Sequence, residues 1–166
     1  MTEELCRLNQ NKTGEQPADL STTLLVDLGD QSEQTYDRII QIVGLLAKYG
    51  TYWGSRSQLS WPSDQEWLSL LPQWFLASFK NHSKEQYKKM MADMPKERWG
   101  ELPWLFGSWT ASMKERVWEW WSCKRHDRML EIHLLLEGWP CSIGALEYLV
   151  KVAGACSIEL IEDDHM

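Results

Sequence analysis

The hydrophobic pattern changes its period once in the first third of the chain. Residues 22–28, TTLLVDL, are β-branched and apolar, which predicts a mostly buried strand. Residues 32–50 then carry apolar side chains such as Tyr36 at helical spacing, and Gly50 stands where a helix C-terminus favours glycine. The pattern predicts one strand followed by one helix.

The centre of the chain is helical in pattern and rich in tryptophan. Two capping boxes predict helix N-termini, with Ser63 paired to Glu66 and Ser83 paired to Gln86. We expect helices over about 63–80 and 83–94, the first divided at Pro72. Residues 95–109 contain two glycines and two prolines, which predicts an irregular connection.

Residues 116–128, RVWEWWSCKRHDR, fit a strand better than a helix. A helical period leaves Trp118 off the apolar face, whereas strand alternation places Trp118 and Trp120 on one face and Trp121 on the other. The next run, RMLEIHLLLE, also alternates. Together they predict a β-hairpin with its turn at 124–127, and we expect Trp121 in the core beneath the helices.

The remaining pattern completes a single α+β domain. Apolar residues at helical spacing predict a helix over 142–154, and a last strand follows at 156–162. The order predicts a ferredoxin-like βαββαβ sandwich with a tryptophan-rich helical insertion, about 60–110, between the first helix and the second strand. We expect this domain to span 21–164, after a flexible N-terminal arm at 1–20.

Charge and composition narrow the class of partner. The 166 residues contain 17 Lys and Arg against 24 Asp and Glu, a net charge of −7 that disfavours nucleic acid and anionic membranes and favours basic partners. The sequence shows neither a signal-peptide pattern nor an apolar run of the roughly 20 residues that span a bilayer. Its four cysteines are scattered, so we expect a cytoplasmic protein.

Candidate chemistry is sparse. Cys123, His126, His133 and Cys141 are the residue types that zinc prefers, and Cys123 beside a histidine could be written as a catalytic dyad. Strand alternation separates Cys123 from His133, however, and there is no glycine-rich phosphate loop, GxSxG or HExxH motif. We therefore expect no catalytic residue, metal or cofactor.

The sheet face left uncovered by the two helices is the first candidate for partner binding. By alternation this face carries Leu25, Asp27, Trp118, Trp120, Glu131, His133 and Glu159. Tryptophans among carboxylates are typical of a binding hot spot for a basic protein. Two alternatives stay open: the helical insertion covers the face and makes the tryptophans core, or the tryptophans stack on RNA bases.

Residues 51–56, TYWGSR, resemble the YWG-x-R motif of an immunity-protein family of bacterial polymorphic toxin systems, whose members accompany restriction-endonuclease-like toxins. The resemblance rests on Tyr52, Trp53, Gly54 and Arg56. It implies a protein that binds a toxin and blocks its active site or assembly. Tyr52, Trp53 and Arg56 would form a second contact patch, unless their loop closes the hydrophobic core instead.

These observations together favour a non-enzymatic immunity protein that neutralises a cognate bacterial toxin, of nuclease type, with a basic surface. A phage-encoded inhibitor of a bacterial defence complex would share the small size and acidity. An RNA-binding module would need its basic residues gathered on one face. A small enzyme would need a cysteine or carboxylate site that the sequence does not identify.

Overall fold

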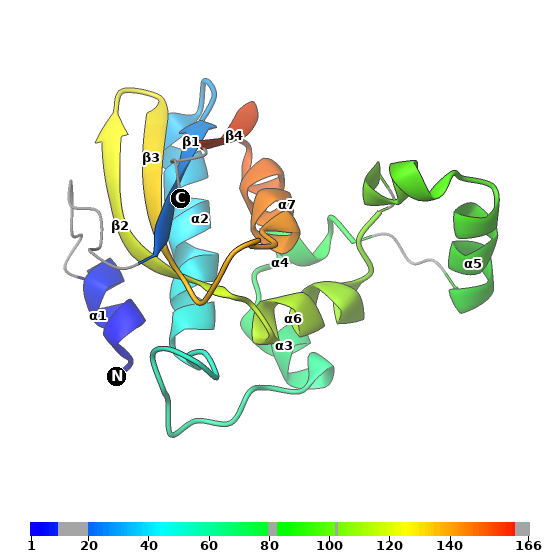
Figure 1. The fold of residues 1–166 in the computed structure, drawn as a ribbon, viewed down its shortest axis with the longest axis horizontal. Coiled ribbons are helices and arrows are strands. Elements are labelled where there is room, and N and C mark those ends of the chain that lie inside the picture. Colours follow the sequence, from blue (N-terminus) through cyan, green and yellow to red (C-terminus); the bar gives the residue numbers. More distant parts are fainter. Residues whose placement is uncertain (10–19, 80–82, 102, 162–166) are drawn as a thin grey trace.

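The computed structural model describes residues 1–9, 20–79, 83–101 and 103–161 as a mixed α+β fold around one antiparallel sheet. The strand order is β2-β3-β1-β4 (Figure 1). The strands are β1 (Ser21–Asp27), β2 (Trp118–His126), β3 (Met129–Leu136) and β4 (Ser157–Ile161). Each lies in a segment where the hydrophobic pattern predicts a strand.

The predicted hairpin is confirmed as β2 and β3, which pair antiparallel. Its turn is shorter and later than predicted, because β2 continues through Lys124 to His126. Asp127 occupies the turn with a φ of +55°, a left-handed conformation that Asp tolerates better than most residues.

Two helices pack against each other and build the core, α2 (Ser32–Ala47) and α7 (Gly144–Ala153). The helical spacing of their apolar residues gives each one buried face, as the sequence predicts. Leu24 and Val26 of β1 are fully buried in the same core as Ile42 of α2. The face of the sheet opposite α2 and α7 is called the distal face below.

A run of helices connects α2 to β2. Its elements are α3 (Asp64–Leu70), α4 (Gln73–Leu76), α5 (Lys84–Ala92), the 3-10 helix η1 (Lys96–Glu101) and α6 (Phe106–Lys114). Both predicted capping boxes are confirmed, and Pro72 separates α3 from α4 as expected. The prediction of an irregular connection over 95–109 is wrong, because α6 begins at Phe106 and buries Trp109 completely.

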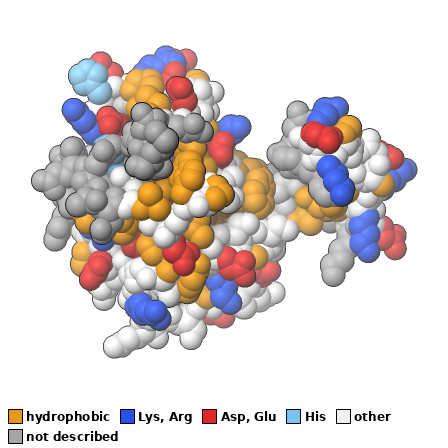
Figure 2. Space-filling view, viewed as in Figure 1, with side chains coloured by type: hydrophobic (Ala, Val, Ile, Leu, Met, Phe, Trp, Pro, Cys, Tyr) orange, Lys and Arg blue, Asp and Glu red, His pale blue; other side chains and the backbone are white. Residues whose placement is uncertain are grey.

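Aromatic rings join these connecting helices to α7. Phe75 lies 4.7 Å from Trp109 between ring centroids, and Phe79 lies 5.2 Å from Tyr148. The arm that carries α5 is different, since α5 packs extensively against no other described element. Figure 2 shows this arm as a separate projection with interspersed basic, acidic and apolar side chains.

The prediction of a flexible arm at 1–20 is wrong for its first part. Residues Glu3–Asn9 form helix α1, which contacts β2 and α2 (Figure 1). Thr2 and Glu4 are buried, with 2% and 0% of their surfaces exposed. A seven-residue helix is marginal alone, so tertiary contacts account for its stability. The rest of the predicted arm, 10–19, lies outside the described residues.

Among the helices of the described residues, none combines the length and the apolar character that a membrane crossing requires.

Candidate partner-binding surface

The sheet register brings part of the first predicted surface together on the distal face. Leu25 lies opposite Glu131 on one side and Glu159 on the other, and Thr23 lies opposite His133. Residues directly opposite in a sheet point to the same face. Five of the predicted residues therefore share the distal face: Leu25, Asp27, Glu131, His133 and Glu159.

Their accessibility differs. His133 is 3% exposed, and its Nδ1 lies 3.2 Å from Thr23 Oγ1. Asp27 is engaged by Arg128, whose Nε and Nη2 each lie 2.8 Å from a carboxylate oxygen. This bidentate pair and the Gly29 amide hold the pKa of Asp27 below its usual value. Glu159 is exposed and Glu131 is half-buried.

The predicted placement of Trp118 and Trp120 on this face is wrong. Both lie opposite core leucines, Trp118 against Leu136 and Trp120 against Leu134. They are 1% and 2% exposed, on the sheet face that α2 and α7 cover. They are core residues.

A β-bulge at Trp121 is the physical reason. Trp120 pairs with Leu134 but Ser122 pairs with His133, so Trp121 is an extra residue in β2. One extra residue shifts the alternation by one position, so the residues before the bulge lie on the opposite face from the one predicted from the residues after it. Cys123 is buried as expected, and the phase shift brings Trp120 onto the same face. The prediction of Trp121 as core is also wrong: it is half-buried, with the Arg7 guanidinium 4.7 Å from its ring centroid.

This correction removes the stacking platform on which the RNA-binding alternative depended. Base stacking needs accessible aromatic faces. Neither Trp118 nor Trp120 offers one. The distal face keeps its carboxylates, but not the aromatic anchors that made it a hot-spot candidate.

The second predicted patch, residues 51–56, is a loop built around the buried carboxylate of Glu119. Thr51 Oγ1 donates to Glu119 Oε1 at 2.6 Å, and Ser55 donates to the same carboxylate from both its amide and its hydroxyl. Gly54 donates from its amide to Thr51 Oγ1 at 3.0 Å. Because the carboxylate collects the loop's donors, the loop is held in one shape.

Gly54 is required by close approach. A Cβ atom there would lie 2.5 Å from Glu119 Oε1 and 2.8 Å from its carboxyl carbon. The absence of a Cβ at Gly54 and the short side chain of Ser55 let the backbone close over the carboxylate. The motif residues Gly54 and Ser55 therefore have a structural role in this protein.

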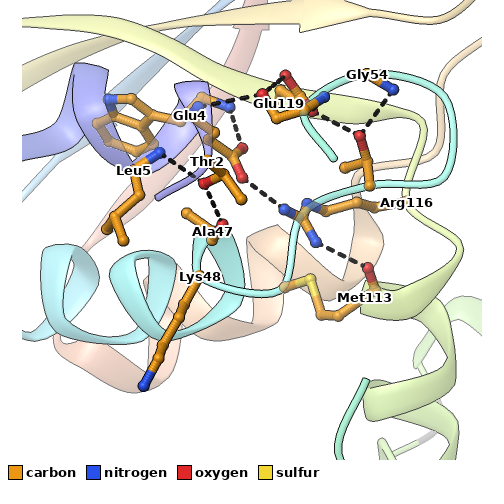
Figure 3. Close-up of polar contacts among 12 residues, drawn as sticks. Thr2, Glu4, Leu5, Ala47, Lys48, Gly54, Met113, Arg116 and Glu119 are labelled. Atoms are coloured by element: carbon orange, nitrogen blue, oxygen red, sulfur yellow. Dashed lines mark hydrogen bonds and ion pairs between the residues drawn. The ribbon is translucent and has the colours of Figure 1, made fainter. Parts of the chain in front are cut away.

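Helix α1 extends this polar cluster to the edge of the sheet (Figure 3). Glu4 accepts from Arg116 Nη2 at 2.6 Å and from the Trp120 amide at 2.7 Å. Arg7 donates to the Trp120 carbonyl at 2.9 Å and contacts Glu119 Oε2 at 3.3 Å. β2 is an edge strand, so α1 satisfies backbone groups that would otherwise invite pairing with another chain.

Three of the four charged side chains in this cluster are almost completely buried. The side chains of Glu4 and Arg116 are 0% and 1% exposed, and that of Glu119 is 2% exposed. Burial raises the pKa of Glu4, and the Arg116 guanidinium opposes that rise. Two carboxylates and two guanidiniums balance in charge, and removing one member of such a buried set is strongly destabilising. The loop therefore packs against a buried cluster of charged side chains.

The loop presents two of the three residues predicted as contacts. Tyr52 is 55% exposed, and its hydroxyl donates to the Glu137 carboxylate. Arg56 is exposed. Trp53 is half-buried, and its indole N–H donates to the Arg116 carbonyl at 3.0 Å, so it fastens the loop to the chain before β2.

The candidate metal and dyad residues are not assembled. Cys123 lies opposite Ile132 on the core face, and His133 points to the distal face. Cys123 Sγ lies 3.9 Å from the Tyr36 hydroxyl, and burial raises the pKa of the thiol. Within the described residues, no group of three histidine, cysteine or acidic side chains could hold a metal.

Sequence reasoning missed Glu4, Arg7, Arg116 and Glu119 as parts of one cluster. A signal was present, because Glu119 interrupts an otherwise apolar strand and a carboxylate in such a position needs a partner. The sequence did not identify that partner, since α1 lies more than one hundred positions earlier.

The chain shows no significant match to a protein-family model, a curated protein or a solved structure.

Proposed function

We propose that this protein is a non-enzymatic immunity protein, which binds a cognate bacterial toxin and neutralises it by blocking its active site or its assembly. The observation that carries the proposal is the preorganised loop 51–56. Its backbone and hydroxyl groups are fixed on the buried Glu119, while Tyr52 and Arg56 stay exposed.

Preorganisation matters because ordering a loop on binding costs affinity. Tyrosine and arginine are also among the residues that contribute most to protein interfaces. A tyrosine and an arginine on a loop that is already ordered suit a tight, stable complex. The resemblance of TYWGSR to an immunity family points to the same class of function.

Charge supports a nuclease-type toxin as the partner. The net charge of −7 favours association with a protein that has a basic surface, and such a surface is expected where a toxin binds nucleic acid. Two carboxylates lie near Tyr52, since the hydrogen bond to Glu137 and the charges of Glu137 and Glu115 all act to raise its pKa. All four cysteines are free, which agrees with the cytoplasmic location that we propose.

We further propose that the fold is a ferredoxin-like βαββαβ sandwich with a tryptophan-rich helical insertion at about 60–110. The strand order, with β1 between β3 and β4, supports this assignment, as does the packing of α2 against α7. An experimental structure with a different strand order would contradict it.

Co-expression with the product of the neighbouring gene tests the function. We expect the two proteins to copurify, and we expect this protein to restore growth to cells that express the toxin. Tyr52→Ala and Arg56→Ala should each reduce rescue, while Lys151→Ala, an exposed substitution on α7, should not. The proposal would be overturned if the two proteins failed to copurify and this protein also failed to restore growth. RNA retained in a salt-sensitive manner would favour the RNA-binding alternative instead.

A further inference from the structure

A hollow of about 610 Å³ lies on one side of Arg56, between the start of α1 and the chain that follows the loop. Its volume is within the range of roughly 300–1,000 Å³ that is typical of binding pockets. The described lining residues are Met1, Thr2, Leu5, Lys48, Arg56, Ser57, Gln58 and Leu59. They combine apolar and cationic side chains and include no carboxylate.

The two cations of this hollow are available to a ligand. Lys48 and Arg56 are both exposed, and neither forms an ion pair with any described residue; the Lys48 ammonium lies 6.0 Å from the centroid of the Tyr49 ring. Other arginines differ: Arg116 is paired with Glu4, and Arg128 with Asp27. The chain as a whole has a net charge of −7, whereas this hollow is lined by two cations that have no carboxylate partner among the described residues.

The apolar part of the hollow is exposed yet anchored. Met1 is 87% exposed and Leu59 is 49% exposed. Thr2 Oγ1 donates to the Ala47 carbonyl and accepts from the Leu5 amide, which fixes one wall (Figure 3). Ser57 fixes the other wall.

Two hydrogen bonds place that second wall. Ser57 Oγ donates to the Lys48 carbonyl at 2.9 Å and accepts from the Leu59 amide at 3.1 Å. Lys48 and Leu59 are thereby held near each other on this wall of the hollow. An apolar side chain seated here would lie beside two cations.

We propose that this hollow binds an acidic segment of a partner protein, in which an aspartate or glutamate lies close to an aliphatic or aromatic side chain. The apolar side chain packs against Leu5 and Leu59, and the carboxylate pairs with Arg56 and Lys48. A guanidinium can bind a carboxylate through two parallel hydrogen bonds, which favours Arg56 as the principal contact. For its biological occupant the inference rests on the proposed function, since the segment would belong to the toxin.

A second hollow, of about 400 Å³, lies on the other side of Arg56 and also includes Ser57. Its lining contains Glu115 as well as Lys114, so its charge is mixed. An acidic segment therefore prefers the first hollow.

Peptide display on the full chain tests the inference. A library of random twelve-residue peptides is panned against the protein at low salt, and the selected peptides are measured by fluorescence anisotropy. We expect selected peptides to carry an acidic residue within four positions of Leu, Met, Phe or Trp. Arg56→Glu should weaken binding at least tenfold, Arg56→Lys should weaken it less, and Lys151→Glu should leave it unchanged.

Several outcomes would overturn the inference: no selected peptide, selected peptides that are neutral or basic, or binding that Arg56→Glu does not affect. Circular dichroism of Arg56→Glu confirms that the variant is folded. If no peptide is selected but the protein binds phosphatidylglycerol vesicles, the hollow would be assigned to an anionic lipid, and the inference of a peptide site would be overturned. Growth rescue distinguishes the two proposals. If the protein rescues growth but selects no acidic peptide, the immunity function stands and the peptide site does not. If it selects acidic peptides but does not rescue growth, the peptide site stands and the immunity function does not.

Discussion

Gly54 and Glu119 approach so closely that a Cβ atom on Gly54 would lie 2.5 Å from the carboxylate oxygen Oε1 of Glu119. This contact joins a surface loop to the buried end of an edge strand. It also explains why a motif with two exposed residues, Tyr52 and Arg56, contains a glycine between them.

Replacing Gly54 with alanine should destabilise the protein, because either the carboxylate or the loop must move. Overpacked sites typically lose about 1–3 kcal/mol. Urea unfolding measures the change. Gly44→Ala is the matched control: it lies in α2, where a new Cβ would meet no atom within 4 Å other than the adjacent backbone of its own helix, and alanine in a helix should stabilise by up to about 1 kcal/mol. Equal effects at the two glycines would contradict the close approach.

Glu119→Ala should cost about 3–5 kcal/mol of unfolding free energy, since it removes the carboxylate that pairs with Arg7 and leaves the donors of Thr51 and Ser55 without their acceptor. Amide hydrogen exchange in residues 51–56 should also accelerate. Glu159→Ala, on an exposed part of β4, should change stability by no more than about 0.5 kcal/mol. Unchanged exchange in Glu119→Ala would show that the loop does not depend on the carboxylate.

Trp120→Ala should behave as a core truncation and lose about 3–5 kcal/mol. Tyr52→Ala, which removes an aromatic ring that is 55% exposed, should lose about 1 kcal/mol or less. Chemical denaturation compares the two. A Trp120→Ala variant of nearly native stability would place that ring at the surface and restore the hypothesis that the tryptophans bind a partner.

The Asp27–Arg128 pair should make stability depend on acidic pH. The pKa of Asp27 is lowered by the Arg128 hydrogen bonds, so the folded state favours the ionised carboxylate. The contribution is present above the ordinary value of 3.8 and is lost as pH falls through the lower folded pKa. In Arg128→Gln, an NMR titration of Asp27 should show a pKa that returns toward 3.8. An identical titration in both proteins would rule out the pair as the cause.

Much of the secondary structure follows from local patterns in the sequence. The capping boxes at Ser63 and Ser83 fix two helix starts through hydrogen bonds within one turn, so the sequence alone locates them. The strands at 21–27 and 157–161 were also predictable, because apolar β-branched runs end at turn residues.

The predictions from sequence are wrong where contacts between residues far apart in the chain determine the structure. Strand alternation predicts both faces correctly only when no residue is inserted, and nothing in EWWSC marks Trp121 as a bulge. The short helix α1 has no strong periodicity, and it is ordered by Arg116 and Trp120, which lie far away in the sequence. The candidate surface in the structure is therefore the loop that contains the TYWGSR motif, and not the tryptophans of the sheet.

The dissociation constant of the complex with the cognate toxin tests the central claim most directly. It should be measured by calorimetry for the native protein, for Tyr52→Ala/Arg56→Ala and for the control Lys151→Ala. We expect the double variant to fold normally and to bind at least about a hundredfold more weakly, since each hot-spot residue contributes roughly 2 kcal/mol or more. A double variant that binds the toxin as tightly as the native protein would contradict the assignment of the loop as the partner-binding surface.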